Sequence, residues 1–103
     1  MMLYELIATL EKEDPEKVIH FGFHNPHSYR GYYEDLAFEP CKNIEIKHML
    51  RDAKFALGHT FTGWKGGEFK MDQYSNCWLA NVGESGETIG DLLLYLMLNW
   101  KDE

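Results

Sequence analysis

Two segments of this chain lack acidic residues, although the chain as a whole is strongly acidic. The 103 residues include 17 Asp and Glu against 10 Lys and Arg, yet residues 17–33 and 53–67 contain neither Asp nor Glu. These segments hold nine residues that could contact a ligand: Asn25, Ser28, Tyr29, Arg30, Thr62, Trp64, Lys65, Gly66 and Gly67. Guanidinium and ammonium groups neutralise phosphate, aromatic rings stack on bases, and glycine lets a backbone N–H approach an anion. Together the two segments predict a binding site for a nucleotide-sized anion.

Each of these residues also has an ordinary structural interpretation. The three tyrosines of the first segment could pack at the rim of the core, and Arg30 could pair with Glu34 or Asp35. Residues 63–67, rich in glycine, could form a turn and nothing more. At the level of sequence both interpretations stay open.

His24 and His27 come closest to the spacing of a metal site, which Asp35 or Cys41 could complete. The two histidines lie three positions apart in a proline-containing segment, and no H-E-x-x-H motif or second Cys and His pair follows. We therefore expect no bound metal and no cofactor. The chain also lacks a P-loop, a Rossmann fingerprint and a G-x-S-x-G motif, and we expect no catalytic residue.

Hydrophobic periodicity predicts the elements that position these residues. Helical spacing of apolar side chains predicts three helices, over residues 1–13, 46–57 and 89–97. Short apolar runs predict five strands, over residues 17–23, 36–40, 60–62, 68–71 and 74–82. Asn25 and Pro26 should form a loop, Asn43 should cap the second helix, and Gly58 should end it. This order predicts one α+β domain over residues 1–103, with about three helices packed on a small antiparallel sheet.

Composition excludes several classes of protein. The 45% hydrophobic content is too high for a disordered tail, and no apolar run reaches the roughly 18 residues of a membrane span, so we expect a soluble intracellular protein. The formal net charge of −7 argues against extended nucleic acid as a partner, because such binding needs many cationic contacts. Cys41 and Cys77 lack C-x-x-C spacing and predict reduced thiols, with a single disulfide as the alternative.

Six short motifs and one methionine occur in combination between residues 21 and 71, and the similarity to which they belong covers about residues 18–97. They are Phe21-Gly22-Phe23, Asn25-Pro26, Ser28-Tyr29-Arg30-Gly31, Leu36-Ala37-Phe38-Glu39-Pro40, Ala56-Leu57-Gly58, Thr62-Gly63-Trp64-Lys65-Gly66-Gly67 and Met71. This combination resembles a family of small bacteriophage proteins, which we associate with the phage anti-CBASS sponges. Sponges of that kind form tetramers and sequester cyclic dinucleotide immune signals such as cGAMP without cleaving them. The resemblance implies a homo-tetrameric immune-evasion protein, not an enzyme, in the cytoplasm of an infected bacterial host.

Two other functions stay open. A metal-dependent cyclic-nucleotide phosphodiesterase would use His24, His27 and an acid, and an acidic inhibitor would dock on a host defence protein.

The broad apolar face of the last helix predicts a subunit interface that includes Leu94, Tyr95, Leu98 and Trp100. Alternatively, one side of this helix packs on the sheet and the rest is scattered surface.

Overall fold

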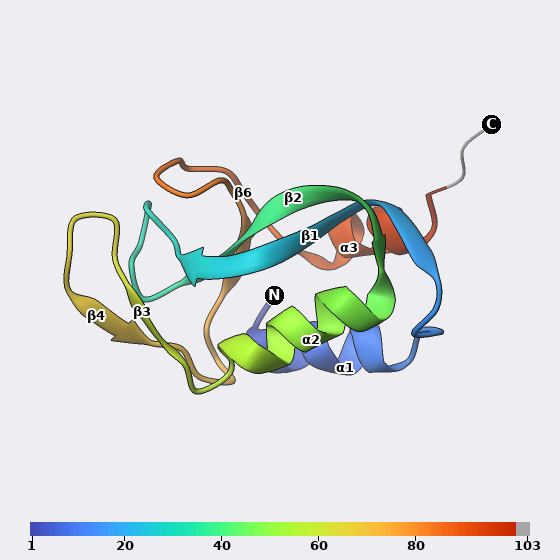
Figure 1. Cartoon of the computed structure of the whole chain (residues 1–103), viewed down its shortest axis with the longest axis horizontal. Coiled ribbons are helices and arrows are strands. Elements are labelled where there is room, and N and C mark those ends of the chain that lie inside the picture. The colour runs from blue at the N-terminus through green and yellow to red at the C-terminus, as the bar shows by residue number, and fades with distance from the viewer. Residues whose placement is uncertain (101–103) are drawn as a thin grey trace.

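The structure, a computed structural model, describes residues 1–100 and has an α+β fold (Figure 1). Its helices are α1 (Leu3–Glu11), α2 (Ile46–Ala56) and α3 (Asp91–Leu98). One sheet contains, in spatial order, β1 (Val18–Ser28), β2 (Leu36–Glu45), β5 (Cys77–Leu79) and β6 (Glu87–Thr88). A separate hairpin is formed by β3 (Thr60–Thr62) and β4 (Glu68–Lys70). The fold class expected from the sequence is confirmed.

Helices α1 and α2 lie side by side beneath the β1–β2 pair and form the core with it (Figure 1). The apolar stripe of α1 is buried, as its spacing predicts: Leu3, Leu6, Ile7 and Leu10. On the sheet, the rings of Phe23 and Phe38 lie 4.5 Å apart and are both fully buried. Burying one such ring contributes about 1.5–3 kcal/mol, so this pair anchors the sheet to the helices.

Strand β1 is longer than the sequence predicts. It passes through Asn25 and Pro26, where we expected a loop, and ends at Ser28. The pairing register shifts between His24 and Pro26, and Asn25 has φ +52°, so a β-bulge absorbs one residue at this point. The expected loop is therefore wrong. Asparagine tolerates the left-handed backbone better than most residues, which explains how the strand continues.

The sheet is mixed, although most of its pairs are antiparallel. Strands β2 and β5 run parallel, with Leu36 opposite Cys77. Parallel neighbours need a long crossover, and here the chain between them forms α2 and the β3–β4 hairpin. This crossover carries the hairpin to the end of the molecule where β1 ends and β2 begins (Figure 1).

Two element boundaries differ from those predicted. Asn43 does not cap α2: it has φ +56° inside β2, and α2 begins at Ile46 after Glu45. The strand expected over residues 74–82 is only three residues long, and Tyr74 and Val82 at its expected ends are 61% and 50% exposed. The strand therefore covers only the middle of the expected range, Cys77–Leu79.

Helix α3 packs on the core with part of its surface only. Leu94, Met97 and Leu98 are buried, whereas Leu92 and Tyr95 are exposed. Leu94 and Leu98 therefore belong to the core, and the subunit interface expected to include them is wrong at these two positions. Within residues 1–100, no helix has the length and apolar character that crossing a membrane requires.

Candidate functional site

Three connections between strands meet at one end of the molecule, which we call the loop end (Figure 1). It comprises residues 29–35, 63–67 and 80–86. The ring of Trp64 packs so closely on Gly83 that a Cβ there would lie 2.8 Å from it. The hydroxyl of Tyr29 accepts a hydrogen bond from the backbone N–H of Gly86 (3.2 Å). The turns of both acid-free segments therefore contact the same loop.

Exposed cationic and aromatic side chains project from the loop end. Arg30 and Lys65 are exposed, and neither forms an ion pair with any residue that the structure describes. Of the seven other cations that the structure describes, Lys17, Lys47, Arg51 and Lys54 are paired with carboxylates, whereas Lys12, Lys42 and Lys70 are also unpaired but lie outside the loop end. Trp64 is 53% exposed although its ring rests on Gly83. Arg30, Lys65 and Trp64 are thus all exposed side chains of the loop end.

The glycines of the β3–β4 turn allow its tight backbone, but a backbone N–H of this turn is hydrogen-bonded within the turn and is not free for a ligand. Gly66 and Gly67 have φ +95° and +81°, which a residue with a side chain rarely adopts. The N–H of Gly66 donates to the carbonyl of Gly63 (2.9 Å), so this donor closes the turn instead of facing a ligand. Thr62 is exposed and pairs with Glu68 at the base of the hairpin.

Tyr29 and Ser28 have structural positions. The Tyr29 ring is buried and stacks on Trp78, with centroids 4.3 Å apart and planes 9° apart. The Ser28 hydroxyl donates to the carbonyl of Tyr33 (2.6 Å) and holds the turn of residues 29–33. Their burial gives Tyr29 no free ring for a base, so the interpretation of this tyrosine as rim packing describes it better.

Asn25 lies in the β1 bulge, where carboxylates surround it. Its side-chain amide donates to Glu39, and its backbone N–H donates to Asp52 Oδ2 (3.1 Å). Two carboxylates at these positions would repel a phosphate. The geometry therefore does not support Asn25 as an anion ligand.

The possible metal ligands are not gathered into a site. Among residues 1–100, no three side chains of His, Cys, Asp or Glu lie closely enough to hold a metal ion. His27 Nδ1 is 3.3 Å from the carbonyl oxygen of Asn25, and its Nε2 is buried without a partner in this part of the chain. Cys41 and Cys77 are free thiols, as expected.

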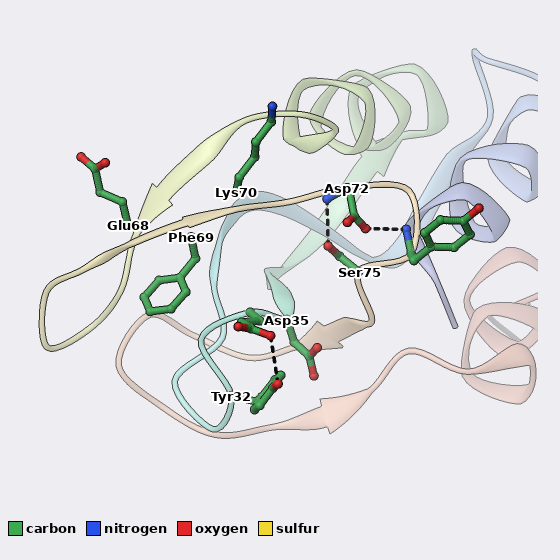
Figure 2. A pocket seen from close by; sticks show the side chains of 9 residues that line it. Tyr32, Asp35, Glu68, Phe69, Lys70, Asp72 and Ser75 are labelled. Carbon is green, nitrogen blue, oxygen red and sulfur yellow. Dashed lines mark hydrogen bonds between the residues drawn. The ribbon is translucent and has the colours of Figure 1, made fainter.

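A cavity of about 480 Å³ opens beside the loop end, between the turn after β1 and strand β4 (Figure 2). Nine residues line it: Tyr32, Glu34, Asp35, Glu68, Phe69, Lys70, Asp72, Tyr74 and Ser75. Figure 2 shows Phe69 pointing toward Tyr32 and Asp35, with Glu68 and Lys70 on the other side of β4. The volume suits a nucleoside-sized group. Because the remaining charged lining residues, Glu34, Asp35 and Asp72, are all acidic, the cavity favours hydrogen-bond donors over phosphate.

Two hydrogen bonds organise the wall formed by residues 32–35. Trp78 donates its indole N–H to Asp35 Oδ2 (2.9 Å), and Tyr32 donates its hydroxyl to Glu34 Oε2 (3.0 Å). The bond to Glu34 raises the pKa of Tyr32 above its ordinary value. The sequence reasoning did not select Asp35 and Trp78 as a pair. A tryptophan that is partly buried in a strand needs an acceptor for its indole N–H, and this requirement could have indicated a carboxylate beside Trp78.

Comparisons with family models, with curated proteins and with solved structures find no match to this chain. The resemblance to the phage sponges therefore stays a prediction.

Proposed function

We propose that this protein binds and sequesters a cyclic dinucleotide defence signal of the cGAMP type, without cleaving it, in the cytoplasm of an infected bacterial host. The observation that carries the proposal is the pair of exposed, unpaired cations Arg30 and Lys65 at the loop end. They come from the two acid-free segments. The turn that holds Arg30 lines a cavity of nucleoside size through Tyr32, and strand β4, which follows the turn of Lys65, lines it through Phe69. A cyclic dinucleotide has two phosphates, which the two cations can neutralise, and two bases, one of which the cavity can hold.

The charge of the cavity determines how the ligand is proposed to lie. Carboxylates accept hydrogen bonds and donate none, so Asp35 and Glu34 suit the N–H groups of a base and repel a phosphate. A base would therefore enter the cavity beside Phe69 while the phosphates stay outside, at Arg30 and Lys65. The exposed ring of Trp64 offers a surface on which the second base can stack.

The chemistry of the loop end favours binding over reaction. A guanidinium and an ammonium group neutralise phosphate and donate hydrogen bonds to its oxygens. An indole stacks and donates one hydrogen bond. Hydrolysis of a phosphodiester by water uses a general base, and none of these three groups is one. They therefore support retention of an intact ligand.

Thermal unfolding with a library of cyclic mono-, di- and oligonucleotides tests this function. We expect a cyclic dinucleotide to raise the melting temperature, because binding to the folded state alone adds about 2.7 kcal/mol at a hundredfold excess over Kd. Chromatography of the ligand released by heating should recover it intact. Recovery of a linear product would indicate a phosphodiesterase, and no stabilisation by any nucleotide would favour an inhibitor that docks on a host protein.

Matched variants locate the site. Arg30→Ala and Lys65→Ala should each weaken binding at least tenfold, because a charge-assisted contact contributes about 1.5–3 kcal/mol. Lys12→Ala removes the same charge from an exposed position at the end of α1 and should leave Kd unchanged. Trp64→Ala should cost about 1–3 kcal/mol of binding, and Trp64→Phe much less, because stacking needs only an aromatic face. Equal affinity of all these variants would reject the site.

A further inference from the structure

Helix α3 is apolar on the side that faces away from the core as well as on the buried side. Its eight residues include one charged side chain, Asp91. Leu92 is 72% exposed, Tyr95 is 62% exposed and Leu96 is 49% exposed. A helix that is apolar all round is normally covered on all sides, so the outer face lacks a partner in the single chain.

The apolar surface continues beyond the helix. Leu92 and Leu96 are four residues apart in α3 and therefore lie on one side of it. Trp100 follows the end of the helix and is 51% exposed. The ring of Trp100 lies 5.2 Å from that of Phe21 in β1, which is 40% exposed. We call Phe21, Leu92, Tyr95, Leu96 and Trp100 the α3 patch.

The area of the α3 patch approaches what a stable contact between two proteins needs. With about 200 Å² for each large side chain, its five residues expose on the order of 550 Å². Monomeric proteins rarely leave a contiguous apolar patch larger than a few hundred Å² in water. A standard interface buries about 800 Å² on each partner, so the patch supplies about two thirds of one side.

The shape of this region is suited to pairing with itself. A hollow of about 300 Å³ opens between α3 and the sheet, lined in part by Phe21, Pro40, Leu79 and Met97. A two-fold contact uses the same surface on both partners, so that surface must carry both projections and a hollow to receive them. The exposed leucines of α3 are the projections, and the hollow beside Met97 can receive one.

Charge also favours a second copy at this place. The chain has a formal net charge of −7, so two copies repel each other over most of their surfaces. Near the α3 patch, Asp91 is the one charged residue of α3, and the Nζ of Lys42 lies 5.9 Å from the centre of the Phe21 ring. Identical chains can meet here without bringing negative surfaces together.

We propose that the α3 patch binds the α3 patch of a second copy of this chain in a two-fold contact. The contact needs no nucleotide, and its residues lie outside the loop end. A tetramer, as the resemblance to the phage sponges implies, would contain two such pairs.

Light scattering of the protein without nucleotide tests the contact. At high micromolar concentration the wild-type mass should be at least twice the 12.1 kDa of one chain. Leu96→Lys should weaken this association at least tenfold and halve the mass, because it places a charge in an apolar contact. The conservative variant Leu96→Met should keep the wild-type mass. Phe55→Lys is the matched control, since Phe55 is 56% exposed but lies on α2, and it should also keep that mass.

Circular dichroism separates lost pairing from lost folding, and Leu96→Lys should retain the wild-type spectrum because its side chain is half exposed. Replacing Leu92 with lysine provides a second, independent disruption at an even more exposed position. A monomeric wild-type protein throughout the micromolar range would overturn the proposal. So would folded lysine variants at both positions with the wild-type mass.

Discussion

Replacing Gly83 with alanine tests whether the loop end is held together as described. Gly83 has φ +80°, and the ring of Trp64 packs against its backbone. A Cβ at this position would lie 2.8 Å from Cζ3 and 2.9 Å from Cη2 of that ring. Gly58 is the matched control, because it has φ +79° but no atom within 4 Å of an added Cβ.

The two substitutions share one energetic cost and differ in another. Placing alanine in the left-handed region costs about 1–2 kcal/mol, partly offset by about 0.4–1 kcal/mol from the less flexible unfolded chain. Gly58→Ala should therefore lower the free energy of unfolding by roughly 1 kcal/mol. Crowding adds about 1–3 kcal/mol in a packed site, and the half-exposed Trp64 can move, so the extra cost at Gly83 should be about 1 kcal/mol.

Urea denaturation followed by circular dichroism measures both losses. Gly83→Ala should be about 1 kcal/mol less stable than Gly58→Ala, and this difference should vanish when both are made in a Trp64→Ala background. The extra cost arises only from the ring, so its removal abolishes it. Equal losses in the wild-type background would refute the packing of Trp64 on Gly83. That result would also remove the contact that joins the β3–β4 turn to residues 80–86.

Three further substitutions test other parts of the structure. Phe38→Ala removes a fully buried ring 4.5 Å from Phe23 and should cost about 3–5 kcal/mol in urea denaturation, so a loss below about 1 kcal/mol would contradict the core. Trp78→Phe keeps a ring beside Tyr29 but removes the hydrogen bond to Asp35, and should cost about 1 kcal/mol by the same assay. Burial raises the pKa of the Cys77 thiol from 9.0 to about 12. Between these pH values the unfolded thiol releases its proton and the folded one keeps it, so stability should fall as pH rises. Cys77→Ala should have a shallower fall, and an identical pH profile would count against this burial.

The candidate site was only partly predictable. Arg30, Trp64 and Lys65 were selected by residue type in acid-free segments, and the structure leaves all three exposed at one end of the molecule. Tyr29 has the same type and a similar setting, yet it is buried, because Trp78 from a distant strand covers its ring. No local pattern marks that difference. The acidic cavity was not anticipated either, since its walls come from residues on different turns.

Helix α3 illustrates the same limit at the level of packing. Its composition shows that it is apolar, and the sequence placed it correctly near the end of the chain. Which leucines are buried depends on how the helix docks: Leu94 enters the core, whereas Leu92 and Leu96 face outward. Apolar residues lie on all sides of the helix, so periodicity alone does not predict which side faces the core.

The sequence by itself determined the helices, the hairpin and the α+β class, because these follow from patterns within short stretches of chain. The α1 stripe from Leu3 to Leu10 needs only the 3.6-residue period, and Gly58 ends α2 because its own backbone adopts a positive φ. Only the tertiary structure decided the parallel pairing of β2 with β5, the bulge that lengthens β1, and the meeting of the three loops. These features depend on contacts between residues far apart in the chain, whose energies no local pattern of residues contains.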